Sequence, residues 1–68
     1  MDITEKYLFD KGWLIYNYNF YSIGVGIIFN IKDKKIWIKK FLYSKNVLKE
    51  YENIMTVNEL EKICDKHL

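Results

Sequence analysis

Apolar and polar residues alternate over most of residues 13–43, and alternation with a period of two is typical of half-buried β-strands. The pattern divides this region into strands at 13–20, 23–31 and about 35–43. It assigns one set of apolar side chains to a common face of the sheet. That set comprises Leu14, Tyr16, Tyr18, Phe20, Val25, Ile27, Phe29, Ile31, Ile36, Ile38 and Leu42.

Two short turns would join these strands into an antiparallel meander. A turn at 21–22 makes every opposing pair on the common face apolar, beginning with Phe20 opposite Ile23. A second turn, at 33–34, places Ile31 opposite Ile36. Because a slip of one residue would move each side chain to the other face, this agreement favours the register.

Residues 2–11 have the features of a short helix. Asp2 can cap its start, and Glu5 follows three residues later in a variant of the capping box. Gly12 supplies the left-handed conformation that commonly follows a helix. The apolar residues of this segment that share one side are Ile3, Tyr7 and Leu8.

The clearest local signal lies near the end of the sequence. Thr56 and Glu59 match the capping box T-x-x-E, which predicts a helix from Val57 to about Lys66. Its buried stripe consists of Leu60, Ile63 and Cys64, and the same spacing extends to Leu68. Residues 44–55 combine helical spacing of apolar residues with polar interruptions, and we expect a helical turn followed by a loop there.

Together these elements predict one α+β domain over residues 1–68. It contains a three-stranded antiparallel meander with a short N-terminal helix and a C-terminal helix packed on one face. With 68 residues the core is small, and dimer formation is a common remedy for small cores. The composition, 50% hydrophobic and 18% aromatic, excludes a disordered chain.

The second face of the predicted sheet is also apolar, whereas a face exposed to water is normally polar. In the predicted register Trp13 and Trp37 lie in one row, and Phe41 lies across from Gly26. Three candidates could cover this second face. They are the chain's own N-terminal helix or 44–55 segment, a protein partner or second copy of the chain, and nucleic acid. The predicted partner-binding residues are Trp13, Ile15, Ile28, Lys35, Trp37, Lys39 and Phe41.

Nucleic-acid binding has support in the charge distribution. Residues 32–49 contain seven lysines and one acid, whereas residues 50–68 contain five acids and two lysines. Trp37 between Lys35 and Lys39 combines a ring that stacks on bases with ammonium groups that neutralise phosphates. The chain has no arginine, which argues against base-specific recognition and leaves sequence-tolerant single-strand binding as the alternative hypothesis.

A protein partner is the leading hypothesis, because Trp and Tyr are enriched at the energetic centres of protein interfaces. The chain lacks Arg, Ala, Pro and Gln and is rich in Ile, Lys, Asn and Tyr, which indicates an A/T-rich genome. Small chains of this kind are frequent in phages and mobile elements. We therefore expect a small interaction module, with inhibition of a host defence enzyme as its specific form.

Catalytic and cofactor signals are weak, and we expect neither an enzyme nor a metal or cofactor site. His67, the single histidine, lies beside the last residue, and Cys64 falls in the predicted helix stripe. Glu61 and Asp65 would repel one another on a helix. The Gly24-x-Gly26 pattern lacks the third glycine and the following helix of a phosphate loop.

We expect a cytoplasmic location. A single cysteine allows no internal disulfide, which fits a reducing compartment, and residues 1–13 lack a secretory signal. Residues 13–31 carry no charge, so a transmembrane helix is the minor alternative. Polar residues interrupt that segment and its apolar positions alternate, which favours strands over a membrane helix.

Overall fold

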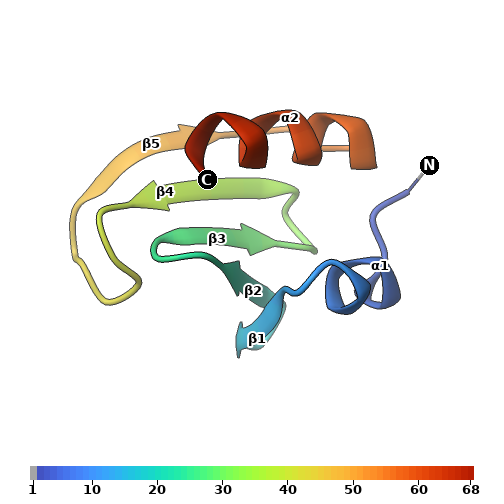
Figure 1. Ribbon diagram of the computed structural model, residues 1–68, viewed down its shortest axis with the longest axis horizontal. Coiled ribbons are helices and arrows are strands. Elements are labelled where there is room, and N and C mark those ends of the chain that lie inside the picture. Colours follow the sequence, from blue (N-terminus) through green and yellow to red (C-terminus); the bar gives the residue numbers. More distant parts are fainter. Residues whose placement is uncertain (1) are drawn as a thin grey trace.

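The computed structural model describes residues 2–68, which form an α+β fold. Its five strands make one antiparallel sheet in which each strand pairs with its neighbours in sequence, in the order β1-β2-β3-β4-β5 (Figure 1). The elements are α1 (Glu5–Asp10), β1 (Leu14–Asn17), β2 (Phe20–Ile23), β3 (Ile27–Asn30), β4 (Lys35–Lys39), β5 (Val47–Tyr51) and α2 (Val57–His67). The predicted fold class is confirmed, but the predicted number of three strands is wrong.

The first predicted strand is divided by a turn at Tyr18 and Asn19. Asn19 has a φ of 63°, a left-handed conformation that asparagine tolerates better than most residues. The Asn17 side chain supports the turn by accepting a hydrogen bond of 2.7 Å from the Tyr18 N–H. The predicted turn at 21–22 is therefore wrong, and residues 20–23 form β2, with Tyr21 facing the core.

The second predicted strand is also divided, by a turn at residues 24–26. Gly24 adopts the left-handed conformation, with a φ of 67°, and Val25 lies exposed in the turn. Gly26 approaches the end of β4 closely, since its carbonyl accepts a 2.7 Å hydrogen bond from the Lys39 N–H. A Cβ atom at Gly26 would lie 2.0 Å from the Lys39 carbonyl oxygen, so only glycine fits there.

Residues 31–34 form the turn between β3 and β4. The Asn30 side-chain oxygen accepts 2.9 Å hydrogen bonds from the N–H groups of Lys32 and Asp33. Phe29 is consequently paired with Ile36, two residues away from the predicted partner, Ile38. A shift of two residues keeps every side chain on its face, so the predicted inward positions on β3 and β4 are confirmed.

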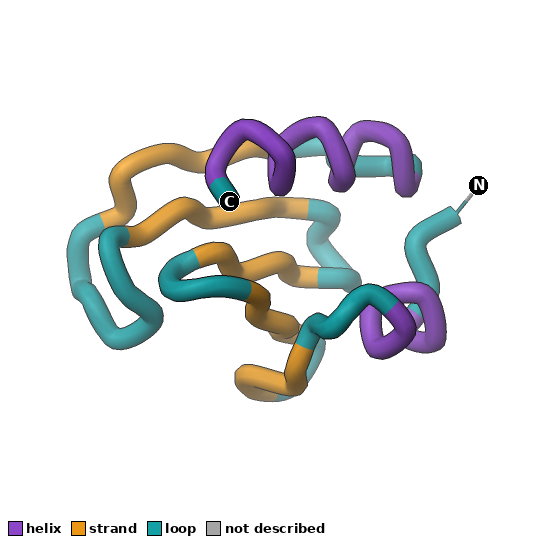
Figure 2. The backbone as a smooth tube through the Cα atoms, viewed as in Figure 1, coloured by secondary structure: helices purple, strands orange, loops and turns teal. Residues whose placement is uncertain are grey.

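Residues 47–51 form β5, so the predicted helical turn in residues 44–55 is wrong. Val47 and Tyr51 belong to residue types that favour strands, and the exposed edge of β4 offers them hydrogen-bonding partners. The long connection at residues 40–46 leads from β4 to β5 (Figure 2). Local helical spacing is therefore outweighed by pairing with a distant strand.

Both helices contribute to one core on one face of the sheet. Around the fully buried Phe29, the remaining buried members are Ile3, Leu8, Trp13, Tyr21, Ile27, Ile36, Ile38, Ile54, Val57, Leu60 and Cys64. Among the residues predicted to be inward, Ile31 packs against this core. Six others lie outside it, contrary to prediction: Leu14, Tyr16, Tyr18, Phe20, Val25 and Leu42.

The start of α2 agrees with the sequence signals, whereas α1 starts later than predicted. Thr56 accepts a hydrogen bond from the Glu59 N–H at 3.2 Å, and Glu59 accepts one from the Thr56 N–H at 3.0 Å. The predicted capping box of α2 is thus confirmed. At α1 the cap is Thr4 and not Asp2, while Gly12 has the expected left-handed conformation, with a φ of 95°.

The uncharged segment 13–31 contains three short strands and their turns. Neither helix in the described range, residues 2–68, has the length and apolar character needed to cross a membrane.

Gly26→Ala tests the close approach of β3 to β4. Gly26 lies outside the left-handed region, so backbone preference alone predicts that alanine is tolerated. The clash with the Lys39 carbonyl should instead lower the free energy of unfolding by about 3 kcal/mol, the upper end of typical overpacking costs. Urea denaturation of the purified variant measures this loss.

Gly24→Ala is the matched control. It introduces a left-handed alanine, whose cost is about 1 kcal/mol. Its Cβ would meet only the end of the flexible Leu68 side chain, at 2.6 Å. If Gly26→Ala proves as stable as Gly24→Ala, the close backbone approach does not exist in solution.

Candidate functional site

The candidate site lies on the outer face, which we define as the side of the sheet opposite the core and both helices. Alternation along the paired strands brings Phe20 of β2, Ile28 of β3 and Trp37 of β4 to this face. Tyr16 joins them from an irregularity in β1, where the pairing with β2 shifts between Ile15 and Asn17. No helix covers these side chains, since α1 and α2 pack against the other face.

A pocket of about 200 Å³ opens on the outer face. Ile28 is 3% exposed and lies at its base, while aromatic rings form much of its wall. The centroids of the Phe20 and Trp37 rings are 5.7 Å apart, with the ring planes tilted by 37°. The complete lining is Tyr16, Phe20, Ile28, Trp37, Lys39 and Val47.

The loop 40–46 borders the Tyr16 side of the pocket. The Tyr16 hydroxyl donates a 3.4 Å hydrogen bond to the carbonyl oxygen of Leu42. The rings of Tyr16 and Tyr43 also lie near one another, with centroids 6.3 Å apart. These contacts connect the first hairpin to the loop that precedes β5, and they fix one wall of the pocket.

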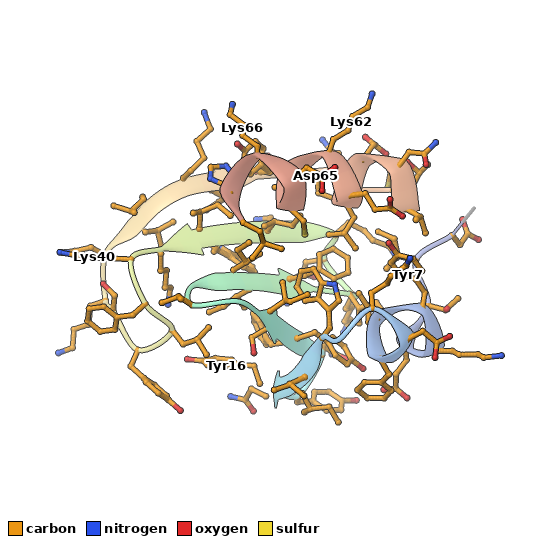
Figure 3. The ribbon with its side chains drawn as sticks, viewed as in Figure 1. Tyr7, Tyr16, Lys40, Lys62, Asp65 and Lys66 are labelled. Carbon is orange, nitrogen blue, oxygen red and sulfur yellow. The ribbon has the colours of Figure 1, made fainter. Side chains whose placement is uncertain are left out.

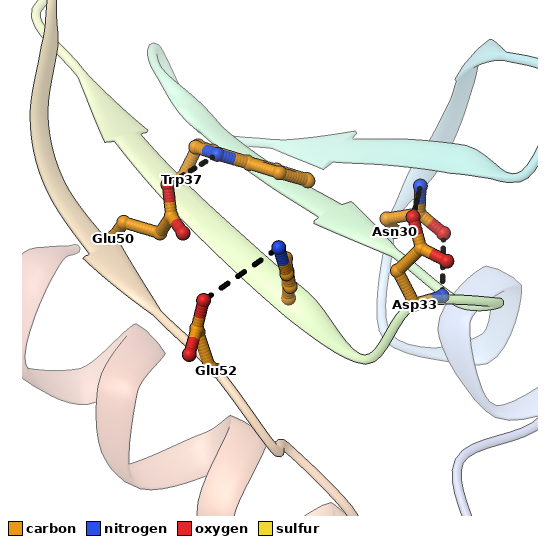
Figure 4. Close-up of polar contacts among 6 residues, drawn as sticks. Asn30, Asp33, Trp37, Glu50 and Glu52 are labelled. Atoms are coloured by element: carbon orange, nitrogen blue, oxygen red, sulfur yellow. Dashed lines mark hydrogen bonds and ion pairs between the residues drawn. The ribbon is translucent and has the colours of Figure 1, made fainter.

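The polar groups of the outer face are unevenly distributed. The Trp37 indole N–H donates a 3.0 Å hydrogen bond to Glu50, and Lys35 forms a 3.6 Å ion pair with Glu52 (Figure 4). Both carboxylates therefore already have partners. Within residues 2–68 the structure shows no such carboxylate beside Lys39, which lines the pocket.

The structure brings together some predicted site residues and separates others. Ile28, Lys35, Trp37 and Lys39 share the outer face, as predicted. Trp13 does not, because it lies in the core with 3% exposure and packs edge-on against Phe29. The predicted row of Trp13 and Trp37 is therefore wrong.

The two remaining predicted residues lie away from the pocket. Ile15 is 65% exposed and faces the helix side of the sheet, since it pairs with Tyr21. Phe41 lies in the loop 40–46, where its backbone N is 3.2 Å from the position of a Cβ on Gly26. Its predicted position across from Gly26 is therefore close to the observed one.

Tyr16, Phe20, Val47 and Glu50 were not among the predicted site residues. Asn19 is the signal that could have identified Tyr16 and Phe20. Asparagine is suited to a left-handed turn, and this turn places the two side chains on the outer face and not in the core. Val47 and Glu50 belong to β5, which has no comparable local signal in the sequence.

The titratable groups with shifted pKa values lie on the helix side. The Tyr7 hydroxyl donates a 2.9 Å hydrogen bond to Glu61 of α2, far from Tyr16 of the outer face (Figure 3). Burial and this contact raise the pKa of Tyr7 to about 12, and burial raises the pKa of Cys64 to about 11. A hydrogen bond to Glu5 raises the pKa of Tyr21.

These groups are protonated at neutral pH, so the Cys64 thiol is not activated as a nucleophile. His67, the single histidine, shares a 2.9 Å hydrogen bond with the Tyr51 hydroxyl. Residues 2–68 contain no cluster of His, Cys, Asp and Glu side chains that could hold a metal ion. The outer-face pocket is therefore the feature from which function is argued.

Comparison of the chain with protein-family models, curated proteins and solved structures finds no match in any of the three.

Acrylamide quenching of fluorescence tests the different environments of the two tryptophans. In Trp13→Phe the remaining Trp37 should be readily quenched, because it lies on the uncovered face. In Trp37→Phe the remaining Trp13 should be protected, because it lies in the core. Acrylamide is neutral, so nearby lysines do not bias the measurement. Equal quenching of the two variants would contradict the assignment of faces.

The raised pKa values predict a loss of stability in alkali. Folding favours the protonated forms of Cys64 and Tyr7, whose ordinary pKa values are 9.0 and 10.0. Their contribution is complete below those values and is lost as pH rises towards 11 and 12, respectively. The melting temperature should therefore fall over this range. Tyr7→Phe should make the fall above pH 10 shallower, and an unchanged profile would contradict the role of Tyr7.

Proposed function

We propose that this chain is a small cytoplasmic protein-interaction module that binds a partner protein through the outer face. The observation that carries the proposal is the aromatic-lined pocket on a sheet face that neither helix covers. Aromatic residues around a pocket are typical of the energetic centre of a protein interface. The single histidine and the unactivated cysteine give no competing support for catalysis.

The size of the pocket favours a side chain over a cofactor or metabolite. Sites for drug-sized ligands usually enclose about 300–1,000 Å³. The outer-face pocket has about 200 Å³, below that range. An apolar side chain of a partner would fill it, while the surrounding face would contact the rest of the partner surface.

Single-stranded nucleic acid is the weaker candidate. Glu50 and Glu52 lie on or beside the face that would receive phosphates. Glu50 contacts Trp37 and Glu52 contacts Lys35, which are two of the residues that would bind nucleic acid. The ring of Phe20 also packs against Trp37, which restricts the ring surface available for stacking a base. Lys35 and Lys39 still support some attraction of polyanions, so a direct test is required.

The specific form of the proposal is inhibition of a host defence enzyme. Its support is the amino-acid composition, which is rich in residues with A/T-rich codons and suits a phage or mobile element. A small face with an apolar pocket is a suitable blocking surface for a larger enzyme.

Selection of peptides from an unbiased displayed library tests whether the outer face is the preferred binding surface. The whole protein serves as bait, so no face is chosen in advance. We expect Trp37→Ala to weaken most selected peptides by about tenfold or more, as at an interface hot spot. Lys62→Ala, on the exposed side of α2, is the control and should leave their binding unchanged. Peptides that are insensitive to Trp37→Ala would contradict the proposal.

Titration with labelled oligothymidylate and oligouridylate separates the two candidate functions. The protein-binding proposal predicts no saturable complex at low salt. A complex that weakens steeply with salt and requires both Trp37 and Lys39 would instead support nucleic-acid binding.

A further inference from the structure

We propose that the outer-face pocket recognises an acidic protein segment, in which an apolar side chain enters the pocket and a neighbouring carboxylate pairs with Lys39. This inference rests on the proposed function and specifies the chemistry of the partner. It follows from the contrast between Lys35 and Lys39, two lysines on the same face of β4.

Lys35 and Lys39 have different surroundings. The Lys35 ammonium lies 3.6 Å from a carboxylate oxygen of Glu52. Lys39 is paired across the strands with Val47 and lines the apolar pocket, and the described part of the chain places no carboxylate in ion-pair contact with it. A partner carboxylate can therefore form a contact at Lys39 that the chain itself does not satisfy.

The loop that follows Lys39 introduces no carboxylate that could pair with it. The loop 40–46 contains Lys40 and Lys45 and no acidic residue, and both lysines are exposed. Tyr16 anchors this loop beside the pocket through its hydrogen bond to Leu42. The opposite end, beyond Trp37, carries the already bonded Glu50.

Partial burial of Lys39 favours a selective contact with its charge. Lys39 is partly buried, and its methylene groups can contact an apolar ligand while the ammonium remains near the pocket rim. Ion pairs at partly desolvated sites are stronger than those in open water. A basic segment would instead be repelled, so the pocket should discriminate between partners of opposite charge.

Three synthetic peptides test the inference. They share a central Leu-Phe pair and differ only in flanking residues, which are aspartates, serines or lysines. Binding is followed by the fluorescence of the Trp13→Phe protein, in which Trp37 is the single tryptophan. The aspartate peptide should bind about fivefold more tightly than the serine peptide, and the lysine peptide should bind most weakly. The preference should diminish as salt is added.

Two matched variants identify the lysine responsible. Lys39→Met keeps an apolar side chain and removes the charge. It should therefore bring the affinity for the aspartate peptide close to that for the serine peptide, without weakening the binding of the serine peptide. Lys35→Met removes a charge from the same strand and face, but one that already has a partner, and should change the preference much less. An equal effect of the two variants would show that only the general positive field matters and would overturn the role of Lys39.

The remaining outcomes also decide the question. Equal binding of the aspartate and serine peptides, or no binding by any of the three, overturns the inference. Whether the outer face binds protein at all is decided separately by the Trp37-dependence of library peptides. An acidic preference could therefore fail while the proposed function stands.

Discussion

The two helices are too short to cover both faces of the sheet, and the rest of the structure depends on this constraint. The sheet has five strands, but the helices contain only 6 and 11 residues, and both pack on the same face. That face gains a closed core around Phe29. The outer face must be shielded by its own side chains, and this explains why Ile28 is buried with no helix above it. The rings that shield Ile28 are also the rings that form the pocket.

The sequence predicted features that depend on neighbouring residues better than features that depend on distant pairing. The capping box at Thr56 and the left-handed Gly12 are local, and both are observed. The inward facing of Phe29 and Ile36 was also predicted correctly, because the error in their register was two residues. The strand β5 could not be anticipated in this way, since its formation depends on the exposed edge of β4.

One turn accounts for the errors that concern the first hairpin in the candidate site. Asn19 reverses the chain earlier than predicted, and Phe20 consequently faces outward. Trp13 lies in the core, so the expected pair of exposed tryptophans does not exist. Lys35, Trp37 and Lys39 were predicted together correctly because they alternate along a single strand, whatever that strand pairs with.

Neither edge of the sheet favours pairing with a further strand. An open sheet can bind through either edge, because edge strands present unpaired backbone groups. Here β1 is four residues long and irregular, while β5 carries Lys49 and Glu50, and both features disfavour added strands. Glu50 has a second role, since its hydrogen bond to Trp37 holds the indole ring in place. A ring that is already held in place loses less conformational freedom when a partner binds. Glu50 therefore protects the edge of the sheet and also fixes the indole ring of Trp37 on the outer face.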